Sequence, residues 1–254
     1  MNTRLLSLFA SFIVVAATFA QDAEQNKGKH LFLLSGQSNM SRFKPKQWFT
    51  PGISKALGAD NVIVCFEAKG GQPISKWYKS WKNNKGESDG EAGQLYDALL
   101  KKMYAATEGT KIQSVTFIWM QGEADAKAKN GSVYLASLNG LKEQLEQDLK
   151  RTDINFIVGR LSDSGFFSTG RGKRNRDQGE RGSAKQIENP QWEMVRKAQV
   201  AFANASERAI WIDTDDLNGE NNQLHYIKPD GYSKLGERYV EAAVKFLKGE
   251  EPTK

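Results

Sequence analysis

Short apolar runs alternate along the chain with longer segments in which apolar residues recur every three or four positions. Five of the short runs predict β-strands, at residues 31–34, 62–66, 115–120, 156–161 and 209–212. The longer segments between them predict amphipathic helices. Continuous apolar strands separated by helices are typical of a parallel sheet that is covered on both faces. The pattern therefore predicts a three-layer α/β/α sandwich with a central parallel sheet of about five strands.

Two helices and one helix start are the clearest of these predictions. Residues 138–149 carry leucine at 138, 141, 145 and 149, and residues 232–246 place Tyr or Leu at 232, 235 and 239 before Phe246. Asn189 followed by Pro190 combines a side-chain cap with a proline suited to a first helical turn, so a helix is expected to begin there.

The first twenty residues differ from the rest of the chain. Arg4 precedes an apolar run at 5–17, and small residues at 18 and 20 form a cleavage pattern, so residues 1–20 are interpreted as a secretory signal peptide. A polar leader at 21–29 then precedes one domain at 30–250. We expect an exported, periplasmic or extracellular protein that does not associate with a membrane after cleavage.

Composition excludes several classes of function. The single cysteine, Cys65, lies in an apolar run and cannot form an intramolecular disulfide. With two histidines far apart, no metal-ligand spacing occurs, and neither a metal nor a cofactor is expected. The formal net charge of +6 suits an anionic partner such as an acidic polysaccharide. Export and the lack of a recognised motif argue against nucleic acid.

Polar motifs follow the predicted strands, which is where a parallel α/β sheet places its ligand site. Gly36–Asn39 follows the first strand, 70–72 (Gly-Gly-Gln) the second and 121–125 (Gln-Gly-Glu-Ala-Asp) the third. The acidic segment 213–216 follows the last strand, and His225 precedes the final helix. These segments are expected to meet at one edge of the sheet.

A serine and a histidine within this set could form a nucleophile and its base. Ser38 lies between a strand end and a helix start, where backbone N–H groups can stabilise an oxyanion. Serine is also a common helix cap, so this motif alone is weak. His30 lies at the entry of the first strand, at the opposite end of the sheet, which leaves His225 as the candidate base.

Four motifs together resemble a known family. They are GQSNM at 36–40, AKGGQPISKW at 68–77, WMQGEADA at 119–126 and LHYIKPDGYSKLGERY at 224–239. The set is similar to the SGNH hydrolases, and more narrowly to the sialate O-acetylesterase-like group, which includes the acetyl xylan esterases of carbohydrate esterase family 6. The resemblance covers nearly the whole chain after residue 20 and implies a flavodoxin-like SGNH fold.

The resemblance implies a role for each matching position. Ser38 would be the nucleophile, His225 the general base, and the backbone N–H groups of Ser38 and Gly71 with the Gln121 amide would form the oxyanion hole. Glu123 and Asp125 would shape the pocket and anchor the loop that bears Gln121, although a carboxylate at a helix N-terminus would look the same in sequence.

One position departs from the family pattern. The acid that usually stands three residues before the histidine is replaced by Asn222, which could orient an imidazole but could not offset its charge. Another acid could take over, namely Glu123, Glu220 or one of the aspartates at 213, 215 and 216. A Ser–His dyad helped by Asn222 could suffice, or the site could have changed its chemistry or lost its activity. The acidic segment 213–216 is better explained as a structural turn.

The segments around the nucleophile favour a carbohydrate ligand. Gln37, Asn39 and Gln72 are candidate substrate-binding residues, Arg42 adds charge, and Trp77 offers a ring that could stack on a sugar. Residues 169–186 are rich in glycine and basic side chains and predict a long loop, either a solvated excursion or a cationic rim. The expected function is removal of acetyl esters from a poly- or oligosaccharide. The alternatives are hydrolysis of another sugar ester, such as a sulfate ester, and a catalytically silent carbohydrate-binding protein.

Overall fold

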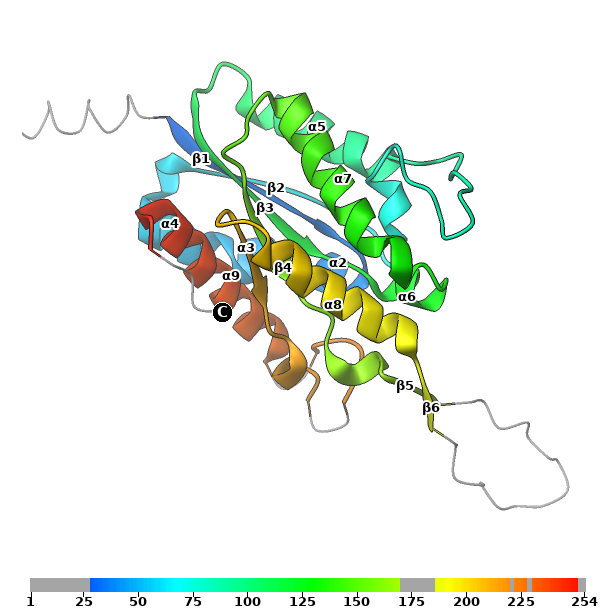
Figure 1. The fold of residues 1–254 in the computed structure, drawn as a ribbon. Coiled ribbons are helices and arrows are strands. Elements are labelled where there is room, and N and C mark those ends of the chain that lie inside the picture. Colours follow the sequence, from blue (N-terminus) through cyan, green and yellow to red (C-terminus); the bar gives the residue numbers. More distant parts are fainter. Residues whose placement is uncertain (1–27, 170–185, 220–221, 228–229, 251–254) are drawn as a thin grey trace, which may run out of the picture.

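The computed structural model describes residues 28–169, 186–219, 222–227 and 230–250 (Figure 1). Its central sheet has five parallel strands in the order β2-β1-β3-β4-β7. The strands are β1 (Lys29–Gly36), β2 (Val62–Ala68), β3 (Ile112–Met120), β4 (Asn155–Gly159) and β7 (Ala209–Ile212). The predicted three-layer α/β/α sandwich is confirmed, since each apolar run in the sequence lies within or overlaps one of these strands.

Helices cover both faces of the sheet (Figure 1). The layer on one face comprises α5 (Gln94–Thr107), α7 (Gly131–Leu149) and α8 (Pro190–Asn204), with the short α6 (Glu123–Lys127) beside it. The other layer comprises α3 (Pro45–Trp48), α4 (Thr50–Leu57) and α9 (Gly231–Lys248). A further short helix, α2 (Ser38–Arg42), directly follows β1.

The predicted helix starts and faces are confirmed at the best-marked positions. The Asn189 side chain accepts a hydrogen bond from Trp192 N, as expected of a cap before Pro190. Leu138, Leu141 and Leu145 of α7 are buried. None of the helices in the described part of the chain has both the length and the apolarity needed to cross a membrane.

A short antiparallel pair was not expected from the sequence. Strands β5 (Phe167–Thr169) and β6 (Gln186–Glu188) pair with each other at the two ends of the segment predicted to be a long loop. Each strand has only three residues. Such a short run carries too few positions for an alternating pattern to be visible in sequence. Residues 170–185, which hold most of the basic side chains of that segment, lie outside the described residues.

The turn that leads from β1 to α2 depends on Gly36. Its φ is +149°, and a Cβ added there would overlap the Met120 carbonyl oxygen, which accepts a hydrogen bond from Gln37 N at 2.9 Å. Glycine therefore lets β1 end against β3 and the chain turn at once into α2.

We expect Gly36→Ala to lower the free energy of unfolding by about 3 kcal/mol or more, because the added methyl group meets backbone on a central strand. Urea denaturation measures this change. Gly90→Ala is the matched control, since apart from its chain neighbours no atom of the described residues lies within 4 Å of a Cβ at Gly90, and it should stay within about 0.5 kcal/mol of the wild type. Equal effects of the two substitutions would contradict the assignment of strain to Gly36.

Candidate active site

Three neighbouring strands bring the predicted motifs to one edge of the sheet. Strands β2, β1 and β3 are adjacent and parallel, so their carboxyl ends point the same way. Segment 36–39 follows β1, segment 70–72 follows β2 and segment 121–125 follows β3. The edge that the sequence assigned to ligand binding therefore carries these three motifs.

Ser38 is half-buried and forms the first residue of α2. Its Oγ accepts a hydrogen bond from Gln37 Nε2 at 3.5 Å. The glycine turn after β2 adjoins it, because a methyl group added at Gly70 would lie 3.8 Å from Ser38 Cβ. At Gly71 φ is +72°, and no atom of the described residues lies within 4 Å of a Cβ built there. The side of Gly71 on which a Cβ would stand is therefore open among the described residues.

His225 lies in the segment between β7 and α9 and is half-buried. Its Nδ1 lies 3.3 Å from Oδ1 of Asn39, the residue that follows Ser38, although the two are 186 positions apart in the chain. Among the described residues, no direct hydrogen bond joins the ring to Ser38 Oγ. Burial, and then the charge of Arg42, lower the pKa of His225, so its ring is neutral at neutral pH.

The side chain of Gln121 is enclosed by other residues of the protein and is not exposed to solvent. Its side chain is fully buried, and its Nε2 lies 3.1 Å from Gln37 Oε1, 3.0 Å from the Gln72 carbonyl and 2.6 Å from Asp125 Oδ2. An amide nitrogen has two hydrogens, and these interior acceptors engage both. In this arrangement both hydrogens of Gln121 Nε2 are directed at protein acceptors, and direct donation from Gln121 to an oxyanion stays a prediction.

Gln37 takes the position nearest the nucleophile. Its Oε1 accepts hydrogen bonds from Gln121 Nε2 and from Ala124 N at 3.0 Å, which leaves its Nε2 directed at Ser38 Oγ. The Gln37 side chain is buried. Gln37, which the sequence suggested as a substrate-binding residue, thus contacts the nucleophile in this structure.

The other predicted substrate-binding residues differ in exposure. Asn39 is buried and contacts His225, which corrects its assignment as a substrate contact. Gln72 is half-buried, and its Nε2 donates to the Gly70 carbonyl at 3.3 Å. Arg42 is exposed and close enough to His225 to affect its pKa. Arg42 is thus the charged side chain of that predicted set that a substrate could reach.

Trp77 cannot stack on a sugar, and that prediction is wrong. Its ring is fully buried, donates Nε1–H to Ser35 Oγ at 2.7 Å and packs edge-on against Trp119 at 5.0 Å. Trp81 is also buried, and Trp48 stacks on Tyr232. These rings belong to the packing that supports the site.

Two carboxylates of the segment after β3 are buried. Burial raises the pKa of Glu123 to about 7 and that of Asp125 to about 6. Glu123 Oε1 accepts a hydrogen bond from Asn39 Nδ2 at 3.2 Å. Asp125 Oδ2 accepts one from Ile74 N at 2.9 Å as well as one from Gln121, so it joins the loop after β2 to the loop after β3.

Asn222 does not contact His225 in this structure. It has a φ of +47°, and its exposed side chain accepts a hydrogen bond from Asn218 Nδ2 at 2.6 Å. The predicted pairing of Asn222 with the imidazole is therefore corrected, and Asn39 takes that place. Glu220, another candidate acid, lies outside the described residues.

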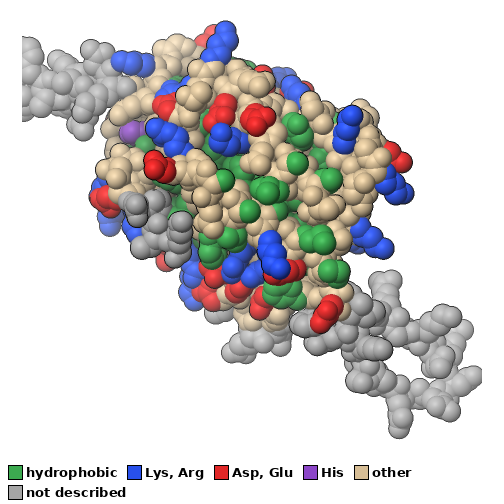
Figure 2. Space-filling model, viewed as in Figure 1, with side chains coloured by type: hydrophobic (Ala, Val, Ile, Leu, Met, Phe, Trp, Pro, Cys, Tyr) green, Lys and Arg blue, Asp and Glu red, His purple; other side chains and the backbone are tan. Residues whose placement is uncertain are grey.

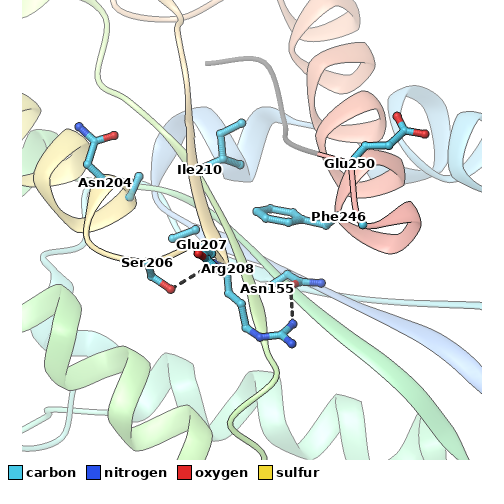
Figure 3. Close-up of a pocket in the computed structure, with 11 residues that line it drawn as sticks. Asn155, Asn204, Ser206, Glu207, Arg208, Ile210, Phe246 and Glu250 are labelled. Atoms are coloured by element: carbon cyan, nitrogen blue, oxygen red, sulfur yellow. Dashed lines mark hydrogen bonds between the residues drawn. The ribbon is translucent and has the colours of Figure 1, made fainter.

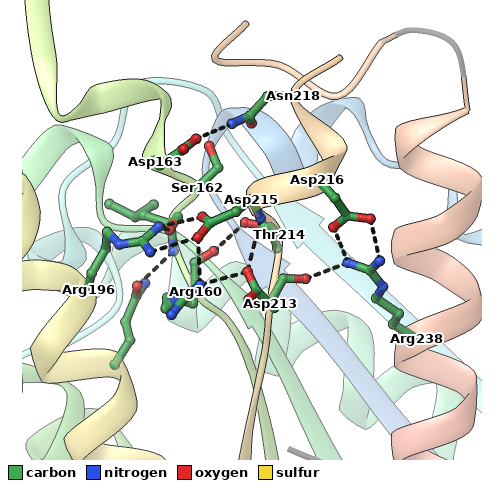
Figure 4. A network of polar contacts seen from close by, with 12 residues as sticks. Arg160, Ser162, Asp163, Arg196, Asp213, Thr214, Asp215, Asp216, Asn218 and Arg238 are labelled. Carbon is green, nitrogen blue, oxygen red and sulfur yellow. Dashed lines mark hydrogen bonds and ion pairs between the residues drawn. The ribbon is translucent and has the colours of Figure 1, made fainter. Parts of the chain in front are cut away.

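The aspartates at 213–216 belong to an ion-pair network at the carboxyl ends of β4 and β7 (Figure 4). Arg160 Nη2 lies 2.7 and 2.8 Å from two of these carboxylates, Arg196 Nη1 lies 2.6 Å from one, and Arg238 Nη2 lies 2.6 Å from another. Thr214 Oγ1 accepts a hydrogen bond from Tyr226 O–H at 3.0 Å, next to His225. The segment is thus a structural turn that anchors the chain leading to α9.

Charge on the molecular surface is mixed. Figure 2 shows Lys and Arg side chains interspersed with Asp and Glu on one face, and not gathered into a single basic patch. The net charge of +6 therefore does not by itself mark a binding surface there.

A hollow lies at the end of the sheet opposite the candidate site (Figure 3). It has a volume of about 580 Å³ and is lined where β4 and β7 begin, by Asn155, Arg208 and Phe246 among others. Within it, Arg208 Nη1 donates to Asn155 Oδ1 at 3.2 Å. His30 is also away from the predicted site, with Nδ1 2.7 Å from Ser114 Oγ.

Solved structures of other proteins share this fold. A protein from Arabidopsis thaliana superposes with a TM-score of 0.56 and 16% identity, over 87% of this chain and 98% of that one. The structure of NanS gives 0.55 and 14% identity, over 87% and 98%. A carbohydrate acetylesterase from Xanthomonas citri gives 0.53 and 16% identity, over 87% of this chain and 56% of that one. No curated protein sequence matches the chain.

A family profile matches residues 41–245, which includes segment 121–125 and His225 and begins just after Ser38. This range spans most of the chain. The matched range contains the polar segments that follow β2 and β3, as well as His225, whereas segment 36–39 lies just before it. The chain belongs to the carbohydrate esterase family described as sialic acid-specific acetylesterase.

Proposed function

We propose that this esterase removes O-acetyl groups from a poly- or oligosaccharide, with Ser38 as nucleophile and His225 as general base. The observation that carries the proposal is the position of His225, whose ring is held against the residue that follows Ser38. The lowered pKa keeps the ring in the neutral form that can accept a proton. Family membership supports the acetyl group as the one removed, and so does the similarity to the Xanthomonas citri carbohydrate acetylesterase.

The reaction proceeds in two steps that His225 serves in turn. Ser38 Oγ attacks the acetyl carbon, while His225 Nε2 accepts the hydroxyl proton and then returns it to the departing sugar oxygen. Water, deprotonated by the same nitrogen, then attacks the acetyl-serine, and the C–Oγ bond breaks as His225 returns the proton to Ser38 Oγ and acetate leaves. Substrate binding brings the imidazole and Ser38 Oγ into hydrogen-bond distance, since such contacts often tighten only in the complex.

Charge on the tetrahedral intermediate requires donors at the open side of Ser38. The backbone N–H groups of Ser38 and Gly71 supply two of them, because Gly71 faces open space and Ser38 begins a helix. Gln37 Nε2, held in place by Gln121, supplies the side-chain donor. Gln121 therefore contributes to the oxyanion hole by fixing Gln37.

The substrate in this proposal is a carbohydrate that carries negative charge and lies outside the cytoplasm. Arg42 is exposed close to His225 and forms no ion pair with any other described residue, so it can bind a carboxylate of an acidic sugar. The apolar run at 5–17 supports export to the periplasm or the cell exterior.

Covalent labelling tests the nucleophile directly. A fluorophosphonate should modify Ser38 Oγ and block release of acetate from an O-acetylated sugar, and peptide mapping by mass spectrometry should find the label there. Ser41 lies on the same short helix, is exposed, and donates to the Ser38 carbonyl at 3.1 Å, so it serves as an internal control that stays unlabelled. Acetate release that persists after complete labelling of Ser38 would refute the proposed mechanism.

A further inference from the structure

Asn39 uses its whole hydrogen-bonding capacity inside the protein. Its Nδ2 lies 3.2 Å from Glu123 Oε1 and 3.0 Å from the Leu224 carbonyl oxygen. Its Oδ1 accepts from Tyr232 O–H at 3.1 Å and lies 3.3 Å from His225 Nδ1. With only 1% of its surface exposed, Asn39 is held by its partners in one orientation.

This orientation fixes the proton on the imidazole. A carbonyl oxygen such as that of Leu224 only accepts hydrogen bonds, so it must face the amide nitrogen of Asn39. The amide oxygen therefore faces His225, and it too can only accept. In the neutral ring the hydrogen must then be on Nδ1, which leaves the lone pair on Nε2, the nitrogen assigned as the base.

Glu123 lies behind Asn39 and completes the arrangement. The side chain is 6% exposed, and its Oε2 has no hydrogen-bond partner among the described residues. Its contact with Asn39 Nδ2 restrains the amide on the side away from His225. The Glu123 carboxyl group is thus linked to the imidazole through Asn39, whereas the acid of a Ser-His-acid triad contacts the imidazole directly.

We infer that Asn39 is the positioning residue of His225, that it replaces the aspartate missing at position 222, and that Glu123 supports it from behind. The inference rests on the proposed function of Ser38 and His225. Its physical consequence is specific. A neutral amide selects the tautomer but does not stabilise the imidazolium, so protonation of His225 should respond strongly when a carboxylate is placed at position 39.

The groups that face the imidazole are few among the described residues. Burial lowers the pKa of His225, and the charge of Arg42 from α2 lowers it further. Tyr232 from α9 and Glu123 from α6 reach the ring only through Asn39. Because the Asn39 side chain contacts His225 Nδ1, a charge placed at position 39 is the most direct way to change the pKa of His225 from that side of the ring.

The test exchanges the amide and the carboxyl group in Asn39→Asp/Glu123→Gln. The exchange keeps the number of carboxyl groups, allows Gln at 123 to donate to Asp at 39, and loses the hydrogen bond to the exposed Leu224. The carboxylate then contacts His225 directly and raises its pKa. The acid limb of the pH profile of kcat/KM for a neutral acetyl ester should move upward by about one pH unit.

Asn222→Asp is the matched control, since it restores an acid at the family position while its side chain faces Asn218. It should leave the acid limb within about 0.2 pH units of the wild type, because the new charge is exposed and screened. A shifted limb in Asn222→Asp, or an unshifted limb in an active exchanged variant, would overturn the inference.

A third variant covers the case in which the exchanged protein does not fold. Asn39→Ala should lower kcat about 100-fold with KM nearly unchanged, because the ring loses its tautomer selection. A kcat within threefold of the wild type would overturn the inference. A different result would show that the proposed function itself is wrong. In that case Ser38→Ala would retain the activity of the wild type, whatever the variants at position 39 do.

Discussion

Replacement of Ser38 by alanine is expected to lower kcat for acetyl-ester hydrolysis by at least about 10⁴-fold, equivalent to about 5 kcal/mol of activation free energy. Without Oγ no acetyl-enzyme forms, and only direct attack by water remains. The backbone donors at Ser38 and Gly71 persist, so weak residual turnover above the uncatalysed rate should remain. Acetate release from an O-acetylated oligosaccharide, measured under single-turnover and steady-state conditions, checks the expectation.

Ser41→Ala provides the comparison for Ser38→Ala. Both residues are in α2, but Ser41 is exposed, and among the described residues its Oγ donates a hydrogen bond only to the Ser38 carbonyl. We expect its kcat to stay within about threefold of the wild type, because one exposed hydrogen bond contributes little. Comparable losses in the two variants, with both proteins folded by circular dichroism, would contradict a nucleophilic role for Ser38.

The fold could be predicted because its signals are local and repeated. Residues 115–120 are apolar at nearly every position, and β3 is buried throughout that stretch since it lies in the middle of the sheet. The pair β5–β6 could not be predicted, because its three-residue strands are defined by each other and not by a pattern within either one.

The location of the site could be predicted for the same reason, but the directions of its side chains could not. Ser38, Gly71 and Gln121 each follow a strand whose carboxyl end faces the site. Which amide reaches the nucleophile depends on backbone at Gly36 and Gly122, with φ of +149° and +145°, and sequence does not reveal those angles. In the structure the amide hydrogen-bonded to Ser38 Oγ is that of Gln37.

Two further misassignments have physical causes. Trp77 stands among polar residues in sequence, yet the short 3₁₀ turn Ile74–Lys76 directs its ring under the sheet edge to Ser35. Asn222 matches the family spacing, but its left-handed φ belongs to a turn that directs the side chain to Asn218. Spacing along a loop does not determine where its side chains point.

His225→Gln should lower kcat/KM by about 10³-fold, because Ser38 then has no base and the leaving sugar oxygen has no acid. The pH dependence provides a second measure. In the wild type, kcat/KM should fall on the acid side with an apparent pKa below 6.5, since burial and then Arg42 disfavour the imidazolium. That limb should disappear in His225→Gln.

Arg42→Gln gives the sign of the electrostatic effect on His225. Removal of the positive charge favours the imidazolium, so the pKa of His225 rises and the acid limb moves to higher pH, on a neutral substrate that makes no use of Arg42. Lys55→Gln is the matched control, because Lys55 is an exposed cation on α4 and does not contribute to the pKa of His225. A wild-type limb that persists in His225→Gln, or one that moves to lower pH in Arg42→Gln, would mean that a different group accepts the proton from Ser38.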